Sequence, residues 1–303
     1  MIKGLVITPP VIGRIAIGKV IEKNGKRIPE KDDQFTLTTQ VQGKDGWINH
    51  PLDVELRQGN ENGKLRVIPI RFLFNEPDLN LRAEYSLFDR RSGRPICVGN
   101  GDTCRRYASN GSIQHLPCPS PEGCELAKGG ACKPYGRLNV QIGEDDQLGT
   151  FIFRTTGFNS IRSLTARLNY YQAVSGNRLA CLPLALRIRG KSTAMSYYLP
   201  IFYVDITTRE GMRLEDTIQQ ARGLEQQRRE SGYDQAALDQ AAQQGFANGV
   251  FEDTEEEVTE IIEEFFPPLL DGTEANDAAT TQGKPSLTNK LNRKTQNLTE
   301  TGI

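Results

Sequence analysis

Alternating hydrophobic and polar positions recur through residues 1–208 and predict a series of β-strands. The stretches rich in β-branched, aromatic or alternating apolar residues are 4–10, 13–22, 34–42, 65–74, 81–89, 136–143, 149–157, 182–191 and 196–207. The KNGKR sequence at 23–27 is typical of a tight turn between two antiparallel strands. The pattern therefore favours a sheet in which most neighbouring strands are antiparallel.

Residues 159–176 have a helical period instead of a strand period. The apolar positions recur at three- and four-residue spacing, and they are Ile161, Leu164, Leu168 and Tyr171. Gly176 supplies a stop, and either Asn159 or Ser160 is expected to cap the first turn. We therefore predict that residues 1–208 form one α+β body.

The character of the chain changes after residue 208. Polar helices are predicted at 209–232 and 234–249, followed by an acidic helix within 251–270 that ends at two prolines. The apolar face of that acidic helix consists of Val258, Ile261, Ile262, Phe265 and Phe266. Residues 209–270 are thus expected to be a helical, acidic extension, and 271–303, poor in apolar residues, a disordered tail.

Residues 90–136 lose the strand pattern and are rich in Gly, Pro and Ser, which predicts a loop-rich insert. Five of the six cysteines fall at 97–132, with the spacing C-x6-C-x13-C-x5-C-x7-C. In a cytosolic protein such a cluster favours a metal site over disulfides. Since the insert at 97–133 has little apolar surface to bury, a zinc ion would supply about 10 kcal/mol of folding free energy.

The expected zinc ligands are Cys104, Cys118, Cys124 and Cys132, with Cys97 and His115 as spare candidates. A closed shell of four thiolates is structural and leaves no open position for water. An iron–sulfur cluster and free structural thiols are the alternatives. The sixth cysteine, Cys181, lies in an apolar run and is expected to be a small core residue.

Charge divides the chain into a basic body and an acidic end. Residues 1–210 carry 29 Lys and Arg against 20 Asp and Glu, whereas 211–303 carry 8 against 18. No acidic residue occurs between Gln147 and Val204, and the candidate contacts to DNA or to a protein partner there are Arg154, Arg162, Arg167, Arg187, Arg189 and Lys191. Either the body meets an anionic partner or the acidic helix folds back on it; uneven charge without a partner is the alternative.

Few features favour catalysis or a membrane. No apolar run of about 18 residues occurs, and the N-terminal segment lacks the features of a signal peptide, so a cytoplasmic protein is expected. Two histidines are the only candidate bases for a catalytic thiol, and no phosphate-binding loop or hydrolase motif is present. The prediction is a protein that is not an enzyme.

Four stretches together resemble a family of phage and mobile-element proteins. They are RIAIGKVIEKNGKRIPEKDDQFTLTT at 14–39, CKPYGRLNVQI at 132–142, LGTFIFRTTGFNSIRSL at 148–164 and CLPLALRIR at 181–189. In order and spacing they resemble the recombination directionality factor-like family, which includes partners of large serine integrases. Relatives are often labelled as hydrolase or metal-binding proteins. The resemblance covers roughly residues 4–208.

The resemblance implies a factor that binds a serine integrase, or another recombination protein, already on DNA and favours excision. Such a protein would be associated with the nucleoid when in complex. An alternative is a protein of a recombination or replication cluster that binds DNA directly. Its stacking groups would be Tyr170, Tyr171, Tyr197, Tyr198 and Phe202, which could equally be core residues. A third hypothesis, a metal-dependent hydrolase, needs an open metal position that four thiolates do not leave.

Overall fold

A computed structural model gives the structure of the chain and describes residues 10–246 together with Phe265. Within that range the residues left out are 24–25, 45, 59–62, 109, 144–148, 193 and 195–196. The strands are β1 (Val11–Lys23), β2 (Lys26–Gly43), β3 (Gly46–Asn49), β4 (Val67–Ile70), β5 (Leu81–Phe88), β6 (Pro95–Gly99), β7 (Thr103–Tyr107), β8 (Ile113–Pro117), β9 (Cys132–Val140), β10 (Thr150–Thr155), β11 (Leu184–Lys191) and β12 (Ile201–Thr208). The helices are α1 (Pro51–Gln58), α2 (Pro77–Asn80), α3 (Ser120–Gly123), α4 (Phe158–Ser175), α5 (Leu214–Glu230) and α6 (Gln235–Phe246), with short 3-10 turns η1 (Glu125–Gly130) and η2 (Leu179–Cys181).

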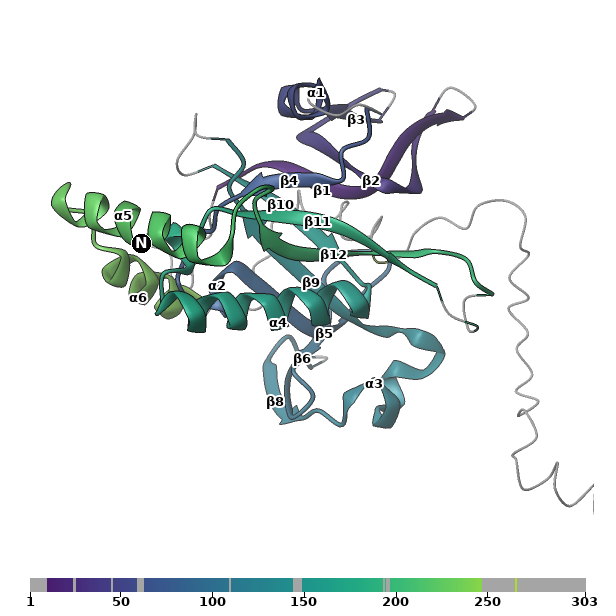
Figure 1. Ribbon diagram of the computed structural model, residues 1–303. Helices are drawn as coiled ribbons and strands as arrows, with labels where there is room; N and C mark the ends of the chain where they lie inside the picture. The colour runs from purple at the N-terminus through teal and green to yellow at the C-terminus, as the bar shows by residue number, and fades with distance from the viewer. Residues whose placement is uncertain are drawn as a thin grey trace, which may run out of the picture. The chain divides into compact units, whose positions relative to one another are not determined.

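The described strands form two sheets (Figure 1). The large sheet has nine strands in the order β3-β2-β1-β10-β9-β5-β6-β7-β8, and the small sheet has the order β12-β11-β4. The contact between β1 and β10 is parallel, and the other named strand pairs are antiparallel. The expected hairpin at 23–27 joins β1 to β2, with Lys23 opposite Lys26. The α+β class and the mainly antiparallel sheet are confirmed.

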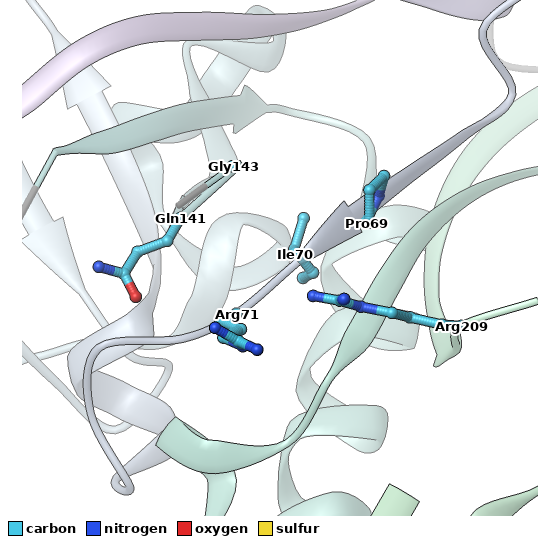
Figure 2. A pocket seen from close by; sticks show the side chains of 6 residues that line it. All are labelled: Pro69, Ile70, Arg71, Gln141, Gly143 and Arg209. Carbon is cyan, nitrogen blue, oxygen red and sulfur yellow. The ribbon is translucent and has the colours of Figure 1, made fainter. Parts of the chain in front are cut away.

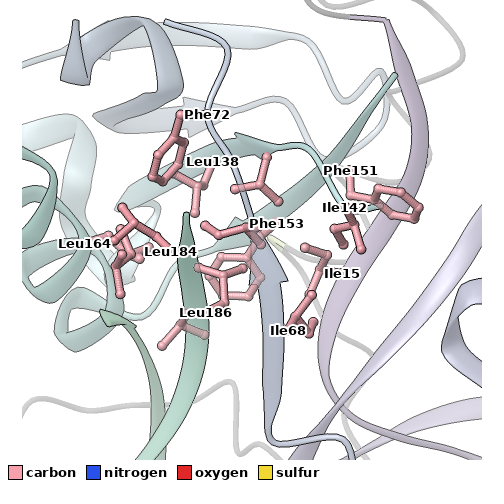
Figure 3. Close-up of a cluster of buried hydrophobic side chains, with 14 of the residues drawn as sticks. Ile15, Ile68, Phe72, Leu138, Ile142, Phe151, Phe153, Leu164, Leu184 and Leu186 are labelled. Atoms are coloured by element: carbon pink, nitrogen blue, oxygen red, sulfur yellow. The ribbon is translucent and has the colours of Figure 1, made fainter. Parts of the chain in front are cut away.

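The main hydrophobic core contains side chains from both sheets (Figure 3). On the large sheet Leu138 lies opposite Phe153, and both are almost fully buried. On the small sheet Leu184 pairs with Ile70, and these side chains belong to the same core cluster. Burying one side chain of this size contributes about 1.5–3 kcal/mol, so the alternating apolar pattern of these strands accounts for the packing.

Helix α4 supplies the third part of this core. Its four predicted apolar positions are all buried: Ile161, Leu164, Leu168 and Tyr171. It ends as expected at Gly176, which takes a left-handed conformation with φ of 65°. The predicted side-chain cap is wrong, because the N-cap is Gly157 and no side chain caps the helix. The Ser160 hydroxyl instead accepts a hydrogen bond from the backbone of Val204, and Asn159 binds Lys191.

The cysteine-rich segment is not the loop-rich insert that its composition suggested. Strands β6, β7 and β8 continue the large sheet beyond β5 in antiparallel register. Residues 118 to 131 consist of short helical turns and loops, and shorter turns join the strands. Backbone pairing to β5 orders this segment even though its strands are short and polar, so the composition misled the prediction.

Helices α5 and α6 pack onto the body. Ala221 of α5 is fully buried in the main core, and Glu225 accepts a hydrogen bond from Arg178 at 2.6 Å. Leu238 and Ala242 of α6 pack against Phe74. The predicted acidic helix within 251–270, apart from Phe265, and the predicted tail at 271–303 lie outside the described residues. No helix in the described ranges is both long and apolar enough to cross a membrane.

Candidate functional site

Three of the predicted thiols share one face of the large sheet. Leu87 of β5 pairs with Cys97 of β6 on one side and with Cys132 of β9 on the other. Cys104 of β7 pairs with Gly99, two residues along β6 from Cys97. Directly opposed residues, and residues two apart on a strand, point to the same face. Cys97, Cys104 and Cys132 therefore come together although 35 residues separate the first from the last.

Gly99 provides the space in which a fourth thiol reaches this group. A Cβ atom at Gly99 would lie 2.7 Å from Cys104 Cβ and 2.9 Å from Cys118 Sγ, so a larger residue would collide with both. Cys118 is held there because its backbone N–H donates to Asp102 at 2.8 Å. The absence of a side chain at Gly99 thus lets Cys118 approach the β6–β7 hairpin.

The fifth thiol, Cys124, lies between α3 and η1, where its carbonyl accepts a hydrogen bond from Ala127 at 3.0 Å. Burial, together with the charges of the other four thiols, raises the pKa of the Cys132 thiol to about 12. We call these five the thiol cluster: Cys97, Cys104, Cys118, Cys124 and Cys132. Burial, together with a hydrogen bond between the Cys104 and Cys97 thiols, raises the pKa of Cys104 to about 11.

The donor chemistry of the thiol cluster suits a metal that prefers sulfur, such as zinc or an iron–sulfur cluster. In the described part of the chain, however, no group of three or more His, Cys, Asp or Glu side chains is arranged to hold a metal ion. The cysteines are free thiols. Zinc bound by Cys104, Cys118, Cys124 and Cys132 therefore stays a prediction that rests on the donor set and on the space at Gly99.

His115 does not point toward the thiol cluster. It pairs with Arg105, one position away from the pair of Cys104 and Leu116, so its side chain faces the other side of the sheet. The structure therefore separates this spare candidate from the thiols. Cys181 is buried in the main hydrophobic core, which confirms the prediction that it is a core residue.

Two of the predicted contact arginines bind the same carboxylate, Asp205, which lies just beyond the stretch of residues 147–204 that contains no acidic residue. Asp205 of β12 accepts hydrogen bonds from Arg189 Nε at 2.7 Å and from Arg167 Nε at 3.0 Å. Ser163 of α4 donates a third at 2.9 Å. Burial opposes the ionisation of Asp205, but these hydrogen bonds outweigh it and lower its pKa. The sequence could have pointed to this network, because Asp205 is the first acidic residue after the basic stretch that ends at Val204.

Three other contact candidates lie on α4 and β11, the elements that carry the three hydroxyl and guanidinium donors to Asp205. Arg187 is directly opposite Asp205 in the β11–β12 register and is partly buried. Lys191 donates to Asn159 at the start of α4 at 2.6 Å, and Arg162 is exposed on that helix. The structure thus brings basic groups of α4 and β11 together and partly neutralises them with one carboxylate.

Arg154 is placed elsewhere, on the face of the large sheet opposite the main core. It is only 6% exposed and lies directly across from Arg137 of β9, which in turn lies across from Arg82 of β5. Arg14 of β1 is opposite Ile152, two residues before Arg154, and so belongs to the same face. We call these four the arginine row: Arg14, Arg82, Arg137 and Arg154. Arg14, Arg82 and Arg137 were not predicted from the sequence, although each is a polar position in a strand of alternating polar and apolar residues.

The aromatic candidates divide between core and surface. Tyr171 is buried in the main core, and Phe202 is partly buried. Tyr197 is 86% exposed and Tyr198 77% exposed, both between β11 and β12, and Tyr170 is exposed on α4. Only the last three are accessible for stacking on a base or a partner.

An open pocket lies where β4 and β9 end (Figure 2). Its lining residues are Pro69, Ile70, Arg71, Gln141, Gly143 and Arg209. Two backbone hydrogen bonds, at 2.9 and 3.1 Å, join Arg71 to Gln141 and hold one wall. The lining side chains bring guanidinium and amide groups to the pocket, which suits binding of an oxyanion or a carbonyl.

A family model described as "Gp3-like: Recombination directionality factor-like" matches residues 12–209. This region includes both sheets, the thiol cluster, α4 and the arginine row. No curated protein and no solved structure shows a significant match to the chain.

Proposed function

The chain belongs to the Gp3-like, recombination directionality factor-like family, and on that basis we propose that it is a non-enzymatic accessory factor of phage site-specific recombination. The observation that carries this proposal is the family match over residues 12–209, which takes in nearly all described strands. In the finer proposal the chain binds a serine integrase on DNA and favours excision over integration. It acts as a cytoplasmic protein, in contact with DNA through the complex.

The physical requirement on such a factor is differential affinity. A ligand shifts an equilibrium between two integrase arrangements only if it binds one of them more tightly. Reversing a 1:99 preference takes a difference of about 10⁴-fold in affinity. We therefore expect the factor to use a rigid and specific contact surface rather than diffuse charge.

The surface proposed for this contact is formed by α4 and β11. It presents Arg162, Arg187 and Lys191, together with two arginines whose orientation is restricted by Asp205. A guanidinium that is already oriented loses less conformational entropy on binding a carboxylate than a free one. This supports an acidic patch on a protein partner as the target.

Zinc is proposed to stabilise the end of the sheet formed by β6, β7 and β8. Cys104, Cys118, Cys124 and Cys132 would hold it, with Cys97 as the spare thiol. When bound, the ion would supply folding free energy to a segment with few buried apolar side chains. With four thiolate ligands it would have no open coordination position for catalysis. Gly99 supports the proposal because it leaves room for Cys118 beside Cys104.

The direct test is recombination in vitro with the serine integrase encoded closest to this chain in its own genetic element. Addition of the chain is expected to permit recombination between the product sites and to inhibit it between the original sites. Arg162→Ala, on the proposed contact surface, should weaken this effect, whereas the control Arg222→Ala, on the exposed side of α5, should not. Identical recombination of both site pairs with and without the chain would refute the role in directionality.

Elemental analysis tests the zinc proposal separately. About one zinc per chain is expected in the wild type, with loss of the metal in Cys132→Ser and retention in Cys181→Ala. If the protein contains iron and has a visible absorption band, the metal centre is an iron–sulfur cluster rather than a zinc site. Freshly reduced protein without metal would end the proposal of a metal centre.

A second candidate function, direct DNA binding, is favoured by the exposed tyrosines Tyr197 and Tyr198 near the basic end of β11. Aromatic stacking beside Arg189 and Lys191 is the combination that single-strand binding proteins use. Affinity for bare DNA should then fall steeply with salt. Binding that requires the integrase would instead favour the accessory role.

A further inference from the structure

The face of the large sheet that carries the arginine row has the properties of an anion-binding surface. Arg82, Arg137 and Arg154 lie directly opposite one another on three neighbouring strands, where Cβ atoms are about 5 Å apart. Arg82 binds Glu84 at 3.0 Å, and Arg14 lies 4.1 Å above the ring of Trp47. Like charges at this spacing repel one another, and Arg14 and Arg154 are buried whereas Arg82 and Arg137 are half-buried. Such a row selects a ligand with several negative groups.

An aromatic site adjoins the row on the same face. Phe88 of β5 and Tyr135 of β9 pack edge to face, with ring centroids 5.5 Å apart. A third ring, Phe265, lies 4.9 Å from Phe88 and 6.1 Å from Tyr135, and it is fully buried. Although Phe265 is 130 residues downstream of Tyr135, these three rings form one cluster of their own. The site therefore recognises an aromatic side chain.

Lys133 adds polar recognition at the same place. Its Nζ donates to the backbone carbonyl of Phe265 at 3.0 Å and lies 5.0 Å from the centre of that ring. Lys133 is two residues before Tyr135 on β9, so both side chains point to the same face. Lys133 therefore contacts both the backbone and the ring of Phe265.

The aromatic site and the arginine row are continuous. Tyr135 and Arg137 are two residues apart on β9, and the Arg137 guanidinium lies 5.6 Å from the Tyr135 ring centre. A segment held by Phe265 can therefore extend along the row. The residues that precede Phe265 match it in charge: positions 252–264 contain eight carboxylates and no basic group.

We propose that this face is a docking site for an acidic peptide with an aromatic anchor, and that residues 251–266 of the same chain occupy it. The ring of Phe265 fills the site made by Phe88, Lys133 and Tyr135. The carboxylates of 252–264 neutralise the arginine row. This inference concerns the chain alone and is independent of zinc and of any integrase.

The test uses a fluorescent peptide of residues 251–270 added to the full-length chain. The wild type should bind it weakly, because a tethered segment competes at millimolar effective concentration. Phe265→Ala in the chain empties the site and should raise the affinity for the unaltered peptide at least tenfold. Phe266→Ala is the matched control and should behave as the wild type does.

Altered peptides keep the test valid even if a chain variant folds poorly. Phe265→Ala in the peptide should weaken binding to the Phe265→Ala chain at least tenfold, and glutamine in place of Glu255, Glu256, Glu257 and Glu260 should weaken it as well. Equal affinity of the peptide for wild type and Phe265→Ala would overturn the proposal. So would a Phe265→Ala chain that binds random duplex DNA but not the peptide, since the face would then be a nucleic-acid site.

Discussion

Asp205 is the carboxylate on which the proposed contact surface depends, so its replacement by asparagine tests that surface most directly. Its side chain is 3% exposed, and it accepts hydrogen bonds from Arg189 at 2.7 Å, Ser163 at 2.9 Å and Arg167 at 3.0 Å. The backbone N–H of Ile206 donates another at 3.0 Å. Asparagine keeps the shape of the side chain but removes the charge.

The size of the effect follows from these contacts. A hydrogen bond to a charged group contributes about 1.5–3 kcal/mol. Arg167 and Arg189 are 44% and 43% exposed, so water screens both ion pairs and can hydrate either guanidinium after the change. The amide oxygen of asparagine can also keep part of the network. We expect Asp205→Asn to lower the free energy of unfolding by about 2 kcal/mol at pH 7.

Urea unfolding at pH 7 measures this difference. The matched control is Glu215→Gln, because Glu215 pairs with Arg213 at 3.6 Å and both side chains are largely exposed. That control should change the free energy of unfolding by less than about 0.5 kcal/mol. A loss below about 0.5 kcal/mol in Asp205→Asn as well would refute the view that this network orders the surface.

The pH dependence follows from the lowered pKa of Asp205. The ionised carboxylate stabilises the folded state fully above its unfolded pKa of about 3.9, and that stabilisation is lost as pH falls through the lower folded value. The difference between wild type and Asp205→Asn should therefore be constant at neutral pH and shrink in acid. A difference that persists undiminished to pH 2 would contradict this assignment.

Three further changes test other parts of the structure. Gly99→Ala places a Cβ 2.7 Å from Cys104 Cβ, so it should lower the free energy of unfolding by about 1–3 kcal/mol and lower the metal content. The control Gly223→Ala, in open space on α5, should be neutral or stabilising. Equal melting temperatures of the two variants would contradict the tight packing at Gly99. Gly136→Ala places a Cβ 2.9 Å from Ile161 Cγ1 and should cost about 1–2 kcal/mol in urea unfolding. The double variant with Ile161→Ala should lose less than the sum of the two single losses, and additive losses would argue against this contact. Burial raises the pKa of Asp239, so stability should increase as pH falls through the raised value, and Asp239→Asn should remove that trend in thermal melts; a trend unchanged in the variant would assign it to another group.

The two ends of the large sheet differ in what holds them together. Around β9 and β10 the strands bury large apolar side chains against α4 and the small sheet. Toward β8 the strands are short, and the exposed fractions of their side chains are high. The thiol cluster lies at this second end, so a metal there would stabilise the part of the sheet that hydrophobic burial stabilises least.

Local patterns were sufficient for much of the fold. The helical spacing of 159–176 predicted α4 and all four of its buried apolar residues, and Gly176 ends it as expected. Strand alternation predicted the strands of the main core. The same reasoning missed β6, β7 and β8, because a short polar strand that pairs with an existing sheet edge has no apolar period of its own.

The sequence alone determined the class of fold, the family resemblance and the gathering of cysteines into one segment, because these depend on periodicity, motif order and spacing along the chain. Only the tertiary structure decided that Gly99 makes room for Cys118, that Asp205 joins two arginines, and that the buried Arg154 belongs to the arginine row. It also brought Phe265 to Tyr135 across 130 residues. Strand register and the packing of distant segments set such contacts, and no local pattern records which residue will lie opposite another.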